Sequence, residues 1–312
     1  MAGDRASSVI ESSVSMESAI LGNTLRAVAY HAVPQSSMSS FSRQLDYFAK
    51  HYVPLDAEGF TQFLAQGSCQ SFGMLENNGH YSANTTISNW QDRARHRPGL
   101  IISFDDGLIE QYEVAAPLLE ARGMRGWFFV PSALLDLEQE FQQDFCALHD
   151  ISLRRKEARK EKTQHSLVSN RIAMGLNEIK DLARRGHVIG CHTAHHVRMR
   201  PTLDAAILLE EIAEAKKELE MRLGHPVNAF AWVGGEPDTY RADALQMLCE
   251  AGFSWIFTTQ SSLFRVGGDT RAIHRTVLEP DLPFPLFLAK INGLSDLMHC
   301  GRRKASLNAM RL

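Results

Sequence analysis

Short apolar runs alternate along the chain with stretches in which apolar residues recur every three or four positions. The runs lack polar alternation and predict strands buried on both faces, whereas the wider spacing predicts amphipathic helices. We expect strands at 25–30, 99–103, 126–130, 187–191, 228–233 and 255–259. We expect helices at 41–52, after Asp56, and at 111–122, 177–185, 203–223 and 242–251, with Gly224 as a C-cap. Repeated strand–helix units favour a parallel α/β sheet closed into a barrel.

The pattern weakens in four places, which divides the chain. Residues 1–23 are rich in Ser, Ala and Glu and predict a disordered N-terminal tail. Residues 24–300 form the expected barrel domain, with a polar surface loop at 66–98 and a helical insertion at about 134–176 over the barrel mouth. The charged run 154–162 in this insertion is interpreted as a solvated helix face. Residues 301–312 are expected to be a basic, solvated tail.

Composition narrows the class of protein. The chain has 312 residues, 44% of them hydrophobic, and a formal net charge of -3, so nucleic acid is not indicated as a partner. Its five cysteines are scattered without a CxxC pair, which favours a reducing compartment over a disulfide framework. The N-terminus lacks the features of a secretory signal and no apolar run is long enough for a transmembrane segment, so we expect a cytoplasmic protein. The oligomeric state is left open.

Two clusters of polar residues directly follow expected strands. Asp105 and Asp106 come after the apolar run 100–104, and His192 and His196 come after the run 188–191. In barrels of this kind chemistry gathers where strands end and loops begin, so the clusters are expected to meet, with His31 at the same rim. Two imidazoles and one carboxylate can bind a divalent metal ion and leave room for water and substrate.

The two aspartates are expected to have different roles. Successive strand positions point in different directions, so Asp106 is assigned as a metal ligand and Asp105 as the general base that takes a proton from water. Each cluster alone has an ordinary alternative, because Asp-Asp-Gly is frequent in turns and His-x-x-x-His is frequent among surface and packing histidines. The motif His-Glu-x-x-His is excluded by Thr193. Together the clusters indicate a metal-dependent hydrolase.

These motifs resemble those of the polysaccharide deacetylases, carbohydrate esterase family four. Ser-Phe-Asp-Asp-Gly at 103–107 is similar to the first family motif, and His-Thr-Ala-His-His at 192–196 is similar to the second. Tyr30-His31 resembles the N-terminal Tyr-His of the bacterial branch that makes or modifies exopolysaccharide. The resemblance covers about 27–259, including the segment 230–235.

The resemblance implies a distorted (β/α) barrel of about seven parallel strands. It implies that Asp106, His192 and His196 hold the metal ion, with Zn2+ as the expected ion, and that Asp105 is the base. In this branch the motif order resembles a circular permutation, which makes His31 the proton donor to the leaving amine. His274 is the competing candidate, because the unpermuted family carries its acid histidine near the C-terminal end. We favour His31.

The third family motif is altered in this chain. Val233 and Gly234 stand where the family has a proline and an aromatic residue, and the motif's usual arginine is absent. Gly234 is still expected to offer a backbone N–H to an oxyanion. Arg275 is the expected substitute for the arginine and would keep Asp105 ionised. Thr193 is expected to support the site by hydrogen bonding.

The implied activity is the metal-dependent removal of the acetyl group from an N-acetylated sugar. The substrate would be a polysaccharide or a lipid-linked or nucleotide-linked saccharide. Two alternatives remain open: hydrolysis of another amide or an ester, such as deformylation or O-deacetylation, and a non-catalytic carbohydrate-binding barrel. The preference for the leaving group is expected to depend on the loops at 66–98 and 134–176, so the sequence does not separate these possibilities.

Overall fold

The structure, a computed structural model, describes residues 23–69, 97–151 and 171–312. The expected N-terminal tail up to residue 22, the loop residues 70–96 and the charged run 154–162 therefore lie outside the described residues. None of the described helices is long and apolar enough to cross a membrane.

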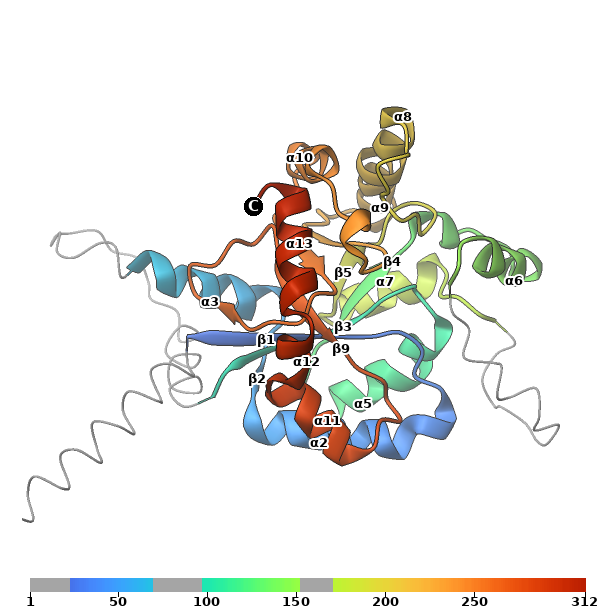
Figure 1. Cartoon of the computed structure of the whole chain (residues 1–312). Helices are drawn as coiled ribbons and strands as arrows, with labels where there is room; N and C mark the ends of the chain where they lie inside the picture. Colours follow the sequence, from blue (N-terminus) through green and yellow to red (C-terminus); the bar gives the residue numbers. More distant parts are fainter. Residues whose placement is uncertain (1–22, 70–96, 152–170) are drawn as a thin grey trace, which may run out of the picture.

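Seven parallel strands of the described chain close into a barrel at the centre of the molecule (Figure 1). They follow the order β3-β4-β5-β6-β7-β9-β1, and β1 pairs in parallel with β3 to complete the ring. The barrel strands are β1 Thr24–Tyr30, β3 Gly99–Phe104, β4 Trp127–Val130, β5 Val188–Cys191, β6 Ala229–Ala231, β7 Trp255–Thr258 and β9 Ile273–Val277. The short β2 Val53–Pro54 pairs in parallel with β3, and β8 Phe264–Arg265 pairs antiparallel with β1. The expected fold class is confirmed.

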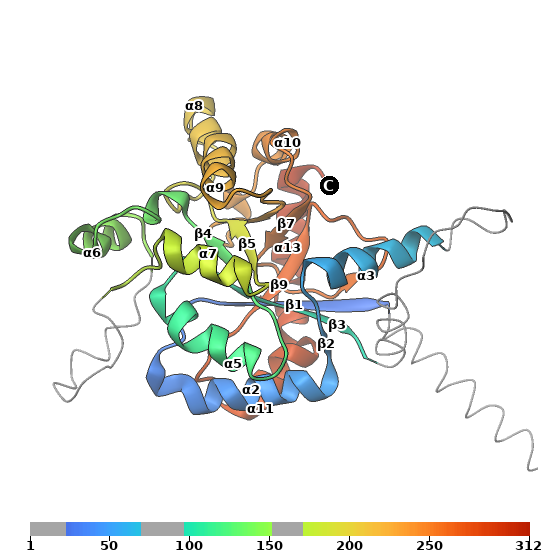
Figure 2. The same ribbon diagram turned by 180° about the vertical axis from the view of Figure 1, so that it is seen from behind.

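Helices surround the barrel on its outside. They are α2 Met38–His51, α3 Ala57–Cys69, α5 Ala116–Glu120, α6 Gln139–Leu148, α7 Leu176–Arg184, α8 Ala205–Leu209, α9 Ala215–Leu223, α10 Ala242–Glu250, α11 Phe284–Ala289, α12 Ser295–Met298 and α13 Cys300–Met310. The opposite view in Figure 2 agrees with Figure 1 that α2, α5 and α11 lie at one end of the molecule and α8, α9 and α10 at the other. Gly224 ends α9 in the left-handed conformation, with φ 76°, which confirms the predicted C-cap.

Alternation along the strands produces two apolar layers. In β4, Trp127 and Phe129 join one cluster, which fills the barrel, whereas Phe128 and Val130 join the cluster between barrel and helices. Because alternate side chains of a strand point to opposite faces, a strand covered on both faces is expected to be largely apolar. All residues of β1, β3 and β4 are buried accordingly.

The C-terminal region differs from the sequence prediction. Strand β9 and helices α11 to α13 were not expected, and the basic tail predicted at 301–312 instead belongs mainly to α13. Ser306 and Met310 are buried there, and Arg303 donates a hydrogen bond to the backbone oxygen of Ser261. The prediction failed because α13 has few large apolar residues and is held by polar contacts as well as by packing.

Candidate active site

The two polar clusters meet at the carboxyl ends of β3 and β5, on either side of β4. Asp106 Oδ1 lies 3.6 Å from His192 Nε2 and 3.2 Å from His196 Nε2. One ligand atom from each of these three buried residues lies within 4.8 Å of the others. Asp106 and His192, 86 residues apart in sequence, thus converge because parallel strands end at one rim of a barrel.

Backbone carbonyls fix the orientation of both imidazoles. His192 Nδ1 lies 2.8 Å from the oxygen of Ala231, and His196 Nδ1 lies 2.7 Å from the oxygen of His149. A carbonyl oxygen only accepts, so each Nδ1 donates, and in the neutral ring each Nε2 then presents a lone pair toward Asp106. Orientation of this kind is common around metal-binding histidines.

The donor set fits a divalent metal ion. Asp106 Oδ1 is buried without a hydrogen-bond partner, although His196 Nε2 is within ion-pair distance, because the proton of that ring is engaged at Nδ1. Three lone-pair atoms therefore face one another in a buried place. A cation bound between them would satisfy all three, and two nitrogens with one oxygen suit zinc and several other divalent ions.

The backbone is left-handed at three positions of the site. The φ angles are 78° at Asp106, 66° at Thr193 and 57° at His196. Non-glycine residues rarely adopt this conformation, which costs of order 1–3 kcal/mol each unless the surroundings enforce it. Strain of this kind is concentrated at functional sites, and here it falls on two of the three candidate ligands.

Glu211 holds the loop that carries the histidines. Its buried carboxylate accepts the backbone N–H groups of Ala194 and His195 at 3.0 and 2.9 Å and lies 2.8 Å from His195 Nδ1. Thr193 Oγ1 accepts the N–H of Val197 at 3.1 Å, in the supporting position expected from the sequence. Glu211 was missed at the sequence level. The sequence feature that could have revealed it is the position of this carboxylate, next to Ile212 on the apolar face of a predicted helix.

Asp105 forms a buried ion pair with Arg275. Arg275 Nη1 donates to Oδ1 at 2.6 Å and Nη2 donates to Oδ2 at 2.8 Å, which is a two-pronged arrangement. The guanidinium also donates to Ser103 Oγ at 3.0 Å and to the oxygen of Thr258 at 3.2 Å. Both side chains are almost inaccessible to solvent, 0% for Arg275 and 2% for Asp105. Arg275 therefore pairs with Asp105, as expected of a substitute for the arginine that the third motif lacks.

The electrostatics of the site favour ionised carboxylates at Asp105 and Asp106 and a neutral imidazole at His192. Burial raises the pKa of Asp105, but the ion pair with Arg275 outweighs it, and the net pKa lies below the ordinary value. Asp106 also has a lowered pKa, because His196, His31 and His192 outweigh its burial. Burial lowers the pKa of His192 to about 4. Both carboxylates are thus ionised, and His192 is neutral, at neutral pH.

A cavity of about 290 Å³ opens over these groups and contains His31 together with Asp105 and Asp106. The competing candidate His274 is not among its lining residues. His274 Nδ1 lies 2.7 Å from Thr258 Oγ1, and burial, with a smaller effect of nearby Arg303, lowers the pKa of His274 to about 4. The structure therefore brings His31, and not His274, to the two aspartates.

The altered third motif forms one wall of this cavity. Gly234 has φ 86°, and a Cβ on Gly235 would lie 2.4 Å from Thr259 Oγ1, so both positions require glycine. Thr259 Oγ1 donates to the oxygen of Gly234 at 2.8 Å, and Gln260 Nε2 donates to the oxygen of Gly235 at 2.6 Å. Trp232 lines the same wall, and its indole nitrogen is buried without a partner.

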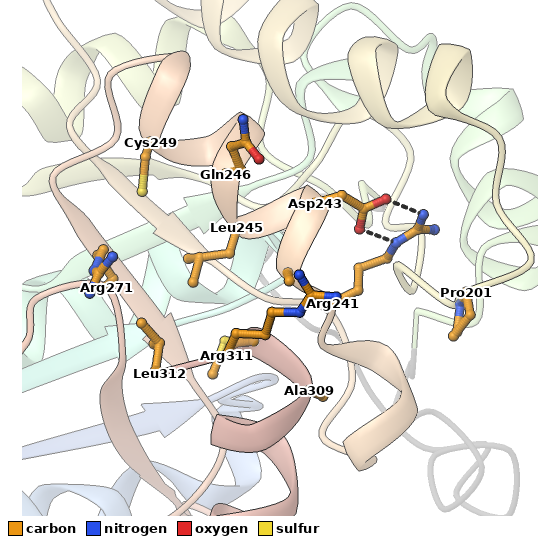
Figure 3. A pocket seen from close by; sticks show the side chains of 12 residues that line it. Pro201, Arg241, Asp243, Leu245, Gln246, Cys249, Arg271, Ala309, Arg311 and Leu312 are labelled. Atoms are coloured by element: carbon orange, nitrogen blue, oxygen red, sulfur yellow. Dashed lines mark hydrogen bonds and ion pairs between the residues drawn. The ribbon is translucent and has the colours of Figure 1, made fainter.

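A larger cavity, of about 760 Å³, lies away from this site between α10 and α13 (Figure 3). Arg241 on its wall is paired with Asp243, and the floor includes Leu245 and Leu312. It contains none of the residues singled out from the sequence. Size alone therefore does not locate the chemistry.

Comparison with known proteins agrees with this geometry. Residues 92–256, more than half of the chain, match the polysaccharide deacetylase family. The chain therefore belongs to this family, whose members are hydrolases that act on carbon–nitrogen bonds. The matched segment includes Asp105, Asp106, His192 and His196 but neither His31 nor Arg275. A search of curated proteins gave no significant match.

Solved structures with the same fold include a deacetylase, a de-N-acetylase and the protein IcaB. The Streptococcus pyogenes deacetylase PplD, solved in complex with acetate, superposes with a TM-score of 0.57 at 16% identity, over 86% of this chain and 98% of that one. IcaB from Ammonifex degensii gives a TM-score of 0.57 at 21% identity, over 86% and 97%. A de-N-acetylase from Aggregatibacter actinomycetemcomitans gives 0.56 at 14% identity, over 86% and 100%. At these identities the likeness is one of fold.

Proposed function

We propose that this protein is a metal-dependent deacetylase that hydrolyses the N-acetyl group of an N-acetylated saccharide. The observation that carries the proposal is the convergence of Asp106, His192 and His196, with lone pairs directed at one another, beside the ion-paired Asp105. Membership of the polysaccharide deacetylase family supports it, as does the likeness in fold to a de-N-acetylase.

We assign separate roles in the reaction to the residues around the cavity. Asp106, His192 and His196 would hold a divalent ion, for which we propose Zn2+, and the bound ion would supply Lewis acidity and an acidified water. Asp105, kept ionised by Arg275, accepts the proton of the attacking water. Gly234 lines the cavity, and we assign its backbone N–H as the donor to the oxyanion.

Protonation of the leaving amine is assigned to His31. This histidine shares the cavity with Asp105 and Asp106, and its position follows from β1, since the N–H of Asp105 donates to the oxygen of Tyr30 at 2.9 Å. Gln111 Nε2 donates to the backbone oxygens of both His31 and Asp105, which ties the proposed acid to the proposed base. His274, outside the cavity, is not assigned a catalytic role.

The substrate is proposed to be a saccharide that carries an N-acetylated hexosamine, in a polymer or attached to a lipid or nucleotide. The test is release of primary amine from a panel of N-acetylhexosamine oligomers and lipid-linked or nucleotide-linked N-acetylhexosamines. The purified full chain would be assayed after loading with Zn2+ and after chelation. Asp105→Asn is the inactive control, because it keeps the shape of the side chain and removes the base.

Measuring acetate together with amine separates the competing activities. Equal release of both identifies N-deacetylation, acetate without amine from O-acetylated sugars identifies an esterase, and formate identifies a deformylase. No product from any substrate after loading with Zn2+, while the panel binds unchanged to Asp105→Asn, would favour a carbohydrate-binding barrel and overturn the proposal.

A further inference from the structure

Three loops meet at the mouth of the cavity through one side chain, Arg198. Arg198 follows the histidine motif after β5, and its Nη1 donates to Asp150 Oδ2 at 2.8 Å. Its Nε lies 3.9 Å from Glu236 Oε2. Asp150 follows α6 in the insertion, and Glu236 follows the altered third motif after β6. All three residues line the cavity.

Arg198 also packs directly against the backbone of Gly234. A Cβ built on Gly234 would lie 3.1 Å from Arg198 Nε and 3.0 Å from Glu236 Oε2. The N–H of Gly235 donates to that same Glu236 oxygen at 3.2 Å, so the proposed oxyanion loop is fastened to one end of the ion pair. The space above Gly234 is thus filled by the Arg198 side chain, where a larger residue at position 234 would otherwise project.

The insertion contacts both ends of this arrangement. His149 accepts the Nδ1 proton of His196 through its backbone oxygen, and the next residue, Asp150, receives Arg198. Asp150 adopts φ 55°, a left-handed conformation that turns its carboxylate toward the mouth of the cavity. One turn of backbone therefore orients a candidate metal ligand and fixes the arginine.

We propose that Arg198 is a positioning residue that bridges Asp150 and Glu236 and thereby fixes the backbone at Gly234 for oxyanion binding. Val233 and Gly234 leave this loop with more conformational freedom than a proline and an aromatic residue would. The side chains of Asp150 and Glu236 are largely exposed, and exposed ion pairs add little to stability, so the bridge acts on placement. This inference rests on the proposed deacetylase function.

Arg200 provides a matched control. It belongs to the same loop and forms an ion pair with Asp238, which follows Glu236 in the same segment, so it links the same two loops. Arg200 does not line the cavity, and no contact connects it to Gly234. Replacing Arg200 removes a comparable exposed ion pair without removing a side chain that packs against Gly234.

The experiment compares Arg198→Ala, Arg198→Lys, Arg200→Ala and the wild-type full chain, each loaded with Zn2+, by steady-state amine release from an N-acetylhexosamine oligomer. We expect Arg198→Ala to lower kcat about tenfold or more while KM changes by less than about threefold, since misplacement of a transition-state donor acts on turnover. Arg198→Lys should recover only part of kcat, because an ammonium cannot bridge two carboxylates as a guanidinium fork does. All three variants should match the wild type in Zn2+ content and thermal stability. Arg200→Ala should also match it in kinetics.

A double-mutant cycle adds a second readout. If Arg198 acts through Glu236, Glu236→Gln should lower kcat as well, and the double variant should be no worse than the poorer single variant. A rise in KM with unchanged kcat would assign Arg198 to saccharide binding and overturn the proposal, and so would equal losses in Arg198→Ala and Arg200→Ala. If the wild type releases no amine, the proposed function fails first, whereas an active wild type with a fully active Arg198→Ala defeats only this inference.

Discussion

Replacing Arg275 by methionine tests the electrostatic basis of the site most directly. The substitution keeps much of the volume between the rings of Phe129 and Phe257, whose centroids lie 5.2 and 6.0 Å from the guanidinium carbon. It removes both hydrogen bonds to Asp105 and leaves a carboxylate that is 1% exposed without its cation. Breaking one side of a buried ion pair typically destabilises the fold by about 3–5 kcal/mol.

The loss of unfolding free energy in Arg275→Met is expected to depend on pH. In the wild type the folded-state pKa of Asp105 lies below its ordinary value, so the ion pair stabilises the fold above about pH 4 and is lost as pH falls through the lowered pKa. In Arg275→Met burial dominates and the pKa of Asp105 rises, so the variant loses stability as pH rises past the ordinary value. The difference in unfolding free energy is therefore smaller near pH 4 than near pH 7, and it becomes small only below the lowered pKa of Asp105 in the wild type.

The assay is urea denaturation of the chelated protein, followed by tryptophan fluorescence between pH 4 and 8, together with the pH profile of kcat/KM for the Zn2+-loaded enzyme. A raised pKa of the base moves the acid limb of that profile to higher pH. Arg26→Met is the matched control. Arg26 is 2% exposed and pairs with Asp296 at 2.7 and 2.9 Å, on a part of the barrel that does not line the cavity. It should cost stability without moving the acid limb.

Removal of both charges gives the sharpest refutation. Asp105→Asn/Arg275→Met leaves no unpaired buried charge and should be more stable at pH 7 than Arg275→Met alone. A pH-independent loss of stability in Arg275→Met, or an acid limb that stays in place, would show that Arg275 does not control the ionisation of Asp105.

Four further substitutions test the remaining assignments. Asp106→Asn should abolish tight Zn2+ binding in calorimetric titration while the protein stays folded, and unchanged affinity would contradict the ligand set. His31→Gln should lower kcat by about 10²–10⁴-fold with Zn2+ content unchanged, whereas His274→Gln should leave kcat unchanged; the reverse ranking would reassign the acid. Gly235→Ala would place a Cβ 2.4 Å from Thr259 Oγ1 and must shift the loop, so kcat should fall by roughly 10²-fold, and wild-type kinetics would exclude the loop from catalysis.

The parts of the fold that follow from apolar runs were predictable from the sequence. β1, β3 and β4 are buried at every position, and their sequences are mostly apolar, so single polar residues such as Arg26 and Ser103 do not obscure them. β9 reads Ile-His-Arg-Thr-Val and was missed. Its arginine can be buried only because Asp105, 170 residues away, neutralises it, and no local pattern reports a partner at that distance.

The candidate site divides in the same way. Its side-chain chemistry was visible in two short motifs, because carboxylates and imidazoles at strand ends are unusual enough to notice. The groups that orient those side chains were not visible, because two of them are the backbone oxygens of Ala231 and His149, which any residue type would offer. Glu211 was the exception, since a carboxylate on the apolar side of a helix indicates a buried polar partner.

Because backbone oxygens orient His192 and His196, the geometry of the candidate metal ligands depends on the loops around the cavity. The oxygen of Ala231 belongs to the strand that leads into the Gly234 wall, and the oxygen of His149 belongs to the insertion that supplies Asp150 to the cavity mouth. A change in either loop that moves its backbone also turns an imidazole away from Asp106. We therefore expect substitutions that alter saccharide preference to fall at other positions of these loops, where the backbone does not orient a histidine of the site.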